Sequence, residues 1–440
     1  MKAAWKAAFA LLLSTAWTWA SAQETQALEY RRSSLNMLML NDEVKSGQEK
    51  LNNWWTSYPF PDKYNDHRGE KSVVDISNVV LSHEELTAYG AWGDTLTGIK
   101  WAAMKALGAD PESGVSVVDL GKNADGKEHG LVVPSAAAQR PYKILKALEE
   151  GGVARNMVAK WFGYNAEANS FSLDLIGERG LYDASLFDVQ AAAQTVKNER
   201  LLKDAGKQLI ANSFVTLSDI DFFANEPLAK AVYDAAMEEA NGNPAGELAA
   251  KKIYQKTKDG YSVVAETFLY QLDWDDAALQ RLYSGWANPS EALAQGEFSL
   301  SLVNSQKTVS TVLLAKGRTM DEVLQEALYR NIDNSFSKLQ KQNEVFMPAV
   351  PVIGVNPITA PIGMKEGLEG GEKFRVFEMT YDPESGETKF VEAGTVKVDK
   401  KQIWNNLFSL SQAEAEGPPQ YTAFKGGKGV FPGMMIKQIK

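Results

Sequence analysis

The sequence predicts an α+β protein with several domains, and three observations support this fold class. The chain has 440 residues, more than a single hydrophobic core usually supports. Helical and strand patterns alternate through most of the chain, which favours mixed helix and strand layers in an N-terminal and a central domain. Short strand patterns separated by turns dominate the C-terminal end and predict a small β-barrel there.

Residues 1–22 have the pattern of a signal peptide. An apolar run, Ala7–Ala20, follows a positively charged start and ends in small residues that suit a signal peptidase, so we expect cleavage between Ala22 and Gln23. The run is too short to span a membrane, which needs about 20 apolar residues. The chain is therefore expected to be exported to the periplasm, the outer membrane or the outside of the cell.

Composition excludes several classes of protein. The chain has no cysteine, so disulfides, thiolate metal sites, a cysteine nucleophile and a lipid-anchored cysteine are all excluded. Without the two lysines of residues 1–22, 44 basic residues remain against 56 acidic ones, a net charge of −12. This charge argues against nucleic acid or an anionic membrane as the main partner. No apolar segment after residue 22 approaches the length of a transmembrane span.

The N-terminal α+β region, residues 23–195, has the least regular pattern. Its expected elements are strands at Tyr30–Leu40 and Val73–Leu81, helices at Asp42–Trp55, Thr95–Leu107 and Lys143–Phe162, and a polar loop at Gly121–Gly130. Gly151 and Gly152 interrupt the last of these helices and favour two helices in its place. A further helical pattern, Leu186–Ala211, leads into the next domain.

The central α+β domain, residues 196–346, has clearer periodicity. Strands with one apolar face are expected at Phe214–Ile220, Tyr261–Trp274 and Phe298–Leu302. Pro227 suits the first turn of a helix that ends near Asn241. Thr319 and Glu322 have the spacing of a capping box, which predicts the start of a long helix.

The last part of the chain is expected to be a linker followed by the barrel. Residues 347–361 contain four prolines, which predict a stiff connector between domains. Residues 362–440 should form the β-barrel-like domain. Its strands are expected at Phe374–Tyr381, Thr388–Val398, Thr422–Phe424 and Met434–Ile439.

Acidic residues are the weak candidates for catalysis. Asp273, Asp275 and Asp276 lie at the end of an expected strand, where adjacent carboxylates could bind a cation or serve as an acid and a base. The alternative, which the pattern favours, is that Asp275 or Asp276 caps the helix beginning near residue 277. Glu178 and Asp183 are further acids that a carboxylate-dependent hydrolase could use.

Histidines do not indicate a metal site. His67, His83 and His129 are far apart in polar stretches, and no His-Glu-x-x-His pair occurs. We interpret them as surface residues and predict no metal. No Walker loop, dinucleotide motif or Gly-x-Ser-x-Gly motif occurs either, so no cofactor is predicted and an enzymatic role is disfavoured.

The densest aromatic cluster consists of Trp54, Trp55, Tyr58 and Phe60. Aromatic faces beside polar groups suit the binding of a sugar or a peptide. The same rings suit a domain core equally well, and the sequence leaves both interpretations open.

Four short segments resemble uncharacterised exported proteins of Bacteroidota. They are LIANSFV at Leu209–Val215, YQLDW at Tyr270–Trp274, IGMKEG at Ile362–Gly367 and FPGM at Phe431–Met434. The resemblance covers roughly residues 160–440 and implies export, and it brings no catalytic residues. A cleavage site followed by glutamine is similar to those of such bacteria.

The C-terminal domain also looks like the closing β-barrel of flagellar assembly protein T. Lys365–Leu368 precedes the strand expected at Phe374, and Pro432 and Gly433 precede the last strand. That family often has aspartate after the Pro-Gly pair, where this chain has Met434, so the resemblance is partial. A likeness of fold assigns no function.

Three hypotheses about function follow from the sequence. The first is a non-enzymatic envelope protein whose domains contact other envelope proteins. The second is a glycan or peptide binder that uses the Trp54–Phe60 cluster. The third is a carboxylate-dependent hydrolase. The ligand and the oligomeric state stay open.

Overall fold

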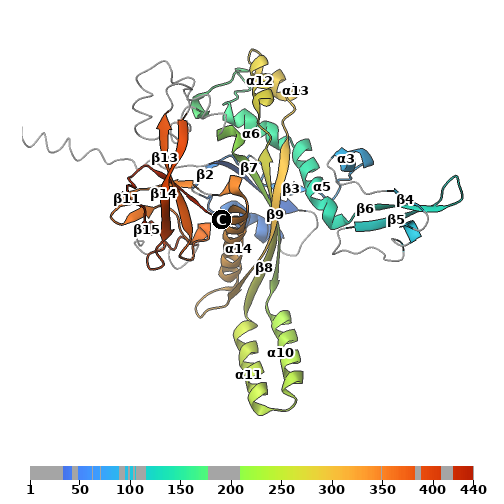
Figure 1. Ribbon diagram of the computed structural model, residues 1–440. Helices are drawn as coiled ribbons and strands as arrows, with labels where there is room; N and C mark the ends of the chain where they lie inside the picture. Colours follow the sequence, from blue (N-terminus) through green and yellow to red (C-terminus); the bar gives the residue numbers. More distant parts are fainter. Residues whose placement is uncertain are drawn as a thin grey trace, which may run out of the picture.

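The computed structural model describes most of the chain after residue 32. The described residues are 33–41, 48–61, 63–69, 71–88, 95–97, 100–102, 105, 115–176, 209–347, 349–381, 388–407 and 420–439. The predicted cleavage site at Ala22 and Gln23 lies outside them, as do Glu178, Asp183 and most of the helix expected at Leu186–Ala211. Helices and three sheets make up the described fold, which confirms the α+β multidomain prediction (Figure 1).

A six-stranded mixed sheet forms the centre of the molecule (Figure 1). Its strands are β1 (Ser33–Asn41), β2 (Tyr64–Asp66), β3 (Val73–Asp75), β7 (Ser213–Ala224), β8 (Gly260–Leu272) and β9 (Leu300–Leu313). The order is β2-β1-β7-β8-β9, with β3 also paired to β1. Strand β1 runs parallel to β2, β3 and β7, whereas β7, β8 and β9 pair antiparallel.

Helices cover both faces of this sheet. The first face packs against α14 (Met320–Gln342) and α2 (Gln48–Ser57), and the second against α5 (Ala136–Glu150), α6 (Val153–Trp161) and α12 (Asp276–Ser284). Side chains of β1 alternate between the two cores, with Leu35 and Met37 on the α14 side and Leu38 on the α6 side. Burial on both faces explains why β1 is a nearly continuous apolar sequence.

The central sheet combines strands from the two regions that were predicted as separate domains. Strands β1 to β3 come from residues 23–195, and β7 to β9 come from residues 196–346. Residues Ser34 to Met39 pair directly with Ser213 to Ser218, so a boundary near residue 195 does not separate two cores. Sequence periodicity describes single strands and does not show which distant strand becomes the neighbour.

A three-stranded sheet, β4-β6-β5, lies at one side of the centre (Figure 1). Its strands are β4 (Thr95–Thr97), β5 (Val115–Lys122) and β6 (Glu128–Pro134), and α3 (His83–Ala88) precedes them. The prediction of a helix from Thr95 was wrong at its start, because Thr95–Thr97 pair with β6. The polar loop expected at Gly121–Gly130 is largely the β5–β6 hairpin.

Two helices, α10 (Glu226–Ala240) and α11 (Pro244–Thr257), are inserted between β7 and β8. They form an antiparallel hairpin that projects from the end of the sheet, away from the rest of the molecule (Figure 1). Pro227 stands in the first turn of α10, and Asn241 ends the helix in a left-handed conformation, as predicted. A shorter helix, α13 (Pro289–Gln295), follows α12.

The C-terminal sheet is a curled antiparallel half-barrel with seven strands. Its strands are β10 (Ala349–Pro351), β11 (Gly354–Val355), β12 (Ile358–Ala360), β13 (Lys373–Tyr381), β14 (Thr388–Val398), β15 (Thr422–Gly426) and β16 (Met435–Gln438). Residues 347–361, predicted as a linker, contain β10 to β12, and Val350, Val352 and Ile358 enter the half-barrel core. Pro351 suits its place in β10, because β10 is an end strand of the sheet and needs fewer backbone donors.

Helix α14 joins the central sheet to the half-barrel. The predicted capping box begins it, with the Glu322 amide donating to Thr319 Oγ1 at 3.3 Å and the Thr319 amide donating to Glu322 Oε2 at 2.7 Å. Farther along, Asp333 accepts a hydrogen bond from the Tyr58 hydroxyl at 2.7 Å and lies 3.9 Å from Lys365 Nζ of the half-barrel. Lys365 belongs to a short 3₁₀ turn, Met364–Glu366.

We expect Tyr58→Phe to lower the free energy of unfolding by about 1.5–3 kcal/mol, because it removes a buried hydrogen bond to a carboxylate. Burial and the neighbouring Asp333 carboxylate raise the pKa of Tyr58 well above its ordinary value, so its hydroxyl stays a donor at neutral pH. Urea unfolding measures the change. Tyr233→Phe is the control, since Tyr233 is half-buried and its hydroxyl has no hydrogen bond to the described residues. Equal losses in both variants would contradict the expectation.

Glu85 makes stability depend on pH in a defined range. Its carboxylate pairs with Lys146 at 2.6 Å and accepts from the Ser82 amide, and these contacts lower its pKa from 4.5 to about 2. A carboxylate with a depressed folded-state pKa stabilises the fold above its unfolded pKa, and the contribution disappears as the pH falls through the folded pKa. We therefore expect the stability difference between the wild type and Glu85→Gln to be constant above pH 4.5 and to vanish toward pH 2. Acid unfolding curves that are identical in shape would contradict this.

Candidate functional site

The three aspartates proposed as weak catalytic candidates have structural partners. Asp275 is the N-cap of α12, where its carboxylate accepts the Ala278 amide at 2.8 Å. Asp273 accepts the hydroxyls of Ser299 and Ser301 at 2.8 and 2.7 Å. Asp276 lies in the first turn of α12, where a negative charge stabilises the helix dipole. The contact of Asp275 matches the capping alternative. These contacts do not place one of the three carboxylates as an acid opposite another as a base.

The four aromatic residues proposed as a ligand platform lie in or against the core below α14. Trp55 and Tyr58 are each 5% exposed, and Tyr58 meets the ring of Tyr329 edge-on at 5.1 Å. Trp54 and Phe60 are half-buried against the same core. Much of the aromatic surface of this cluster therefore faces protein.

The histidines occupy three different settings. His67 was interpreted as a surface residue, but it is 3% exposed and packs against the Trp161 ring of α6 in a tilted arrangement, with ring centroids 4.7 Å apart. His129 is half-buried, and its Nδ1 lies 3.1 Å from the Gly121 carbonyl oxygen. His83 begins α3. Among the residues that the structure describes, no three His, Asp or Glu side chains gather in a group that could hold a metal ion.

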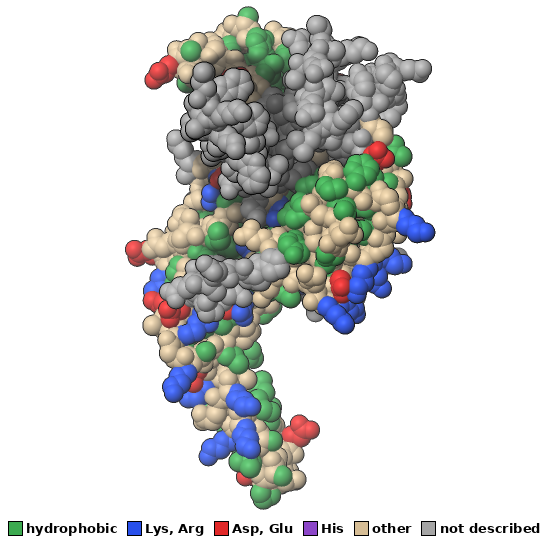
Figure 2. Space-filling view, turned by 90° about the vertical axis from the view of Figure 1, so that its left-hand side faces the viewer, with side chains coloured by type: hydrophobic (Ala, Val, Ile, Leu, Met, Phe, Trp, Pro, Cys, Tyr) green, Lys and Arg blue, Asp and Glu red, His purple; other side chains and the backbone are tan. Residues whose placement is uncertain are grey.

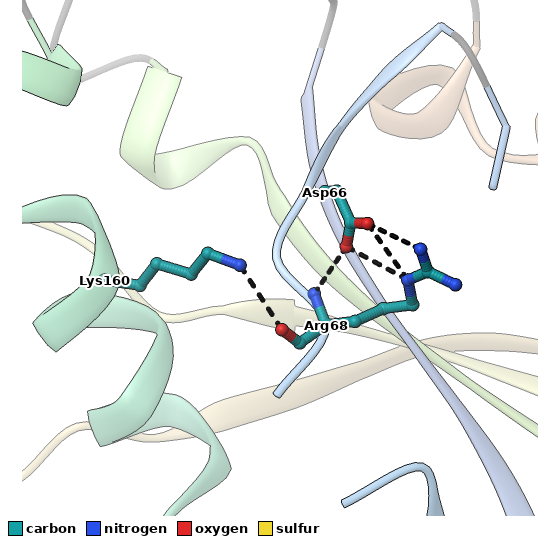
Figure 3. Close-up of polar contacts among 3 residues, drawn as sticks. All are labelled: Asp66, Arg68 and Lys160. Atoms are coloured by element: carbon teal, nitrogen blue, oxygen red, sulfur yellow. Dashed lines mark hydrogen bonds and ion pairs between the residues drawn. The ribbon is translucent and has the colours of Figure 1, made fainter. Parts of the chain in front are cut away.

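A charged cluster of Asp66, Arg68 and Lys160 lies where the chain leaves β2 (Figure 3). The Asp66 carboxylate accepts the Arg68 guanidinium, with Nη2 to Oδ2 at 2.7 Å, as well as the Arg68 amide at 2.9 Å. Burial raises the pKa of Asp66, but the hydrogen bonds from Arg68 outweigh this effect and hold the pKa below its ordinary value. Lys160 of α6 donates to the Arg68 carbonyl at 3.3 Å, and burial lowers its pKa. The hydrogen bond from Lys160 therefore holds the segment after β2 against α6.

Polar side chains continue below this cluster, between the sheet and α6. Ser34 and Asn65 are neighbours across β1 and β2, and both are at most 2% exposed. The Ser34 hydroxyl and both polar atoms of the Asn65 side-chain amide, Nδ2 and Oδ1, have no hydrogen bond within the described residues. Nearby, Trp161 Nε1 donates to Ser213 Oγ at 2.8 Å. These residues carry several hydrogen-bonding groups. Because the groups are buried, they cannot contact a partner at the surface of the protein.

A small cleft lies between α6 and α13. Gly152, Arg155, Leu293 and Phe298 are among the residues that line it, and its volume is about 110 Å³. Ligand pockets for organic molecules usually measure about 300–1,000 Å³. This cleft is therefore too small to support a binding or hydrolytic role by itself.

The α10–α11 hairpin carries several exposed apolar side chains. Leu228 and Val232 of α10 are 56% and 51% exposed, and Leu248 and Ile253 of α11 are 55% and 53% exposed. Figure 2 shows hydrophobic side chains and lysines together on this projection. A contiguous exposed apolar patch is a common mark of a surface that contacts another protein.

The end of the sheet beside the hairpin is also exposed. Phe223, Val309 and Leu313 are 41%, 62% and 43% exposed. They lie on the sheet face opposite α14, as the partly buried Phe222 and buried Val312 next to them show. The helices that cover this face farther along the sheet, α5 and α6, belong to a core that does not include these three residues. Apolar side chains are thus exposed both on the hairpin and at the end of the sheet from which it projects.

Sequence reasoning did not single out the hairpin as a candidate interaction surface. The spacing of Leu228 and Val232 by four residues was a signal of an apolar helix face. That signal does not distinguish an apolar helix surface that packs on a sheet from one that is exposed to water.

Comparisons with known proteins add no assignment, since no protein-family model and no curated protein matches this sequence. The fold defines the class of protein, an α+β multidomain chain with a C-terminal half-barrel. No helix in the described part of the chain is long and apolar enough to cross a membrane.

We expect Asp275→Ala to lower the free energy of unfolding by about 1 kcal/mol, because the variant loses the N-cap of α12. Asp275→Asn should change it little, since asparagine caps a helix as well as aspartate does. Urea unfolding of both variants tests this. If Asp275→Asn lost as much stability as Asp275→Ala, the negative charge itself would be required, and the capping interpretation would fail.

Proposed function

We propose that this chain is a non-enzymatic protein of the bacterial envelope, exported through its N-terminal signal peptide, that works as a protein-interaction module. The observation that carries the proposal is the projecting α10–α11 hairpin with its exposed Leu228, Val232 and Ile253. A chain gains little stability by exposing such residues, since burial of an aliphatic side chain contributes about 1.5–3 kcal/mol. Contact with another protein would recover that energy.

The signal-peptide pattern of residues 1–22 and the resemblance to exported proteins of Bacteroidota support export. The negative net charge of −10 favours a protein partner over nucleic acid. Helix α14 packs on β8, the strand that follows the hairpin, so it would support the root of the hairpin. We propose the periplasm or the outer membrane as its location.

Two alternative functions have weaker support. A glycan or peptide binder using Trp54 and Phe60 would need these rings at the surface, and both are half-buried against the core. A carboxylate-dependent hydrolase using Asp273 and Asp275 would need free carboxylates, and both accept hydrogen bonds that hold local structure. The interaction module agrees better with these contacts.

Chemical crosslinking in intact cells, followed by fractionation and mass spectrometry, tests the proposal. We expect crosslinked products in the envelope fraction, from a chain that lacks residues 1–22. Val232→Asp should reduce the products several-fold, because it places a charge on the apolar face. Lys251→Gln is the matched control, since it changes the net charge by the same amount on a different side of the hairpin.

The proposal would be wrong if the chain formed no crosslinks in the envelope, or if Val232→Asp and Lys251→Gln behaved alike. Circular dichroism of both purified variants checks that each is folded. An uncleaved chain in the cytoplasmic fraction would refute the export part separately.

A further inference from the structure

Strand β9 is the last strand of the central sheet and has an open edge (Figure 1). On one side it pairs with β8 along its whole length, and no described strand pairs with its other side. The backbone amide and carbonyl groups along such an edge can accept a further strand. Native proteins usually block an edge of this kind or cover it.

Alternate residues of β9 direct their backbone groups away from β8. The Leu314 amide donates to the Asp259 carbonyl at 3.0 Å, which fixes the hydrogen-bonded positions of the antiparallel ladder. Because these positions alternate, the amide and carbonyl groups of Val309, Thr311 and Leu313 point toward the open edge. These backbone groups have no hydrogen-bond partner in the part of the chain that the structure describes.

The first half of the edge is blocked, whereas the second half is not. Val303 is skipped in the pairing with β8, which marks a β-bulge, and the Lys338 side chain donates to the Lys307 carbonyl at 3.2 Å. Bulges and lysines are devices by which native proteins prevent pairing at an edge. Residues 308–313 carry no such device, since they include no charge, proline or glycine and are rich in β-branched residues.

The open half of the edge is complementary to itself in one antiparallel register. A two-fold axis at Thr311 sets this residue against its own copy, and it sets Val309 of each chain against Leu313 of the other. Val309 and Leu313 are both exposed, so the register brings exposed apolar side chains together. It also keeps the two copies of Lys307 eight residues apart, which is about 27 Å along the strands.

We propose that two copies of this chain associate by pairing their β9 strands edge to edge, antiparallel and centred on Thr311. The three residues whose backbone groups point outward would all form hydrogen-bonded pairs, and the two central sheets would become one continuous sheet. A single pair of strands buries little area, so the association should be reversible and depend on concentration. This surface is separate from the α10–α11 hairpin, and the inference does not rest on the proposed function.

Crosslinking of single cysteines tests the register, because the chain has no cysteine of its own. Thr311→Cys, treated with a short bismaleimide, should give a crosslinked dimer, since the two copies of residue 311 face each other. Lys307→Cys is the matched control. Residue 307 is exposed on the same side of the same strand, but its copies would be about 27 Å apart, so it should crosslink several-fold less.

Charges placed on the two-fold axis give a second test. Thr311→Lys alone and Thr311→Glu alone should each be monomeric, because pairing would set like charges opposite each other. An equimolar mixture of the two should associate, because each lysine then faces a glutamate. Both variants lose the contact of the Thr311 hydroxyl with Ser262 Oγ, so the mixture isolates the effect of pairing. Light scattering measures the association, and the unmodified chain should show a dimer fraction that rises with concentration.

Equal crosslinking of Thr311→Cys and Lys307→Cys, no association in the mixture of charged variants, or an unmodified chain that is monomeric at every concentration would overturn the inference. A dimer that Val232→Asp abolishes and charges at residue 311 leave intact would also overturn it, because the contact would then lie on the hairpin. Circular dichroism checks that each variant is folded. If a charged variant does not fold, the two cysteine variants decide the question.

Discussion

The burial of helix α14 on more than one side is the constraint on which the rest of the fold depends. An ordinary amphipathic helix covers a core with one face and leaves the other to water. Here Leu328 and Ile332 pack against the central sheet, and Asp333 lies beside Lys365 of the half-barrel. Any rotation or shift of α14 would disturb its packing on the sheet together with its contact to Lys365. The central sheet and the half-barrel are thereby coupled through one helix.

Burial on both sides requires partners for the polar residues of this helix, because an unpaired buried polar group costs about 1–3 kcal/mol. Asn331 donates to the Val263 carbonyl at 2.9 Å and accepts the Thr308 hydroxyl. Glu326 lies between Arg318 and Arg330 and pairs with both. These directional contacts specify the rotation of α14, which apolar packing alone would leave less well defined.

The hairpin differs from this tightly coupled body in its physical support. It meets the sheet at its root, where the Asn225 amide donates to the Gly260 carbonyl at 3.0 Å and Ser262 donates to Asn225. Beyond the root, α10 and α11 pack mainly on each other. Isolated helices of this length are marginally stable in water. A hairpin held at one end by a well-packed body is suited to contact a partner that stabilises its exposed face. The proposed function rests on this property of the hairpin.

Local chemistry determined much of the secondary structure without tertiary information. Thr319 and Glu322 predicted the start of α14, the Gly151–Gly152 pair predicted the break between α5 and α6, and Asn241 predicted the end of α10. Contacts between distant segments decided the rest. The pairing of β1 with β7, the entry of Val350 into the half-barrel and the burial of His67 each depend on a partner far away in sequence. Periodicity shows that a helix or a strand has an apolar face. Tertiary packing alone decides whether that face meets a sheet, another helix or water.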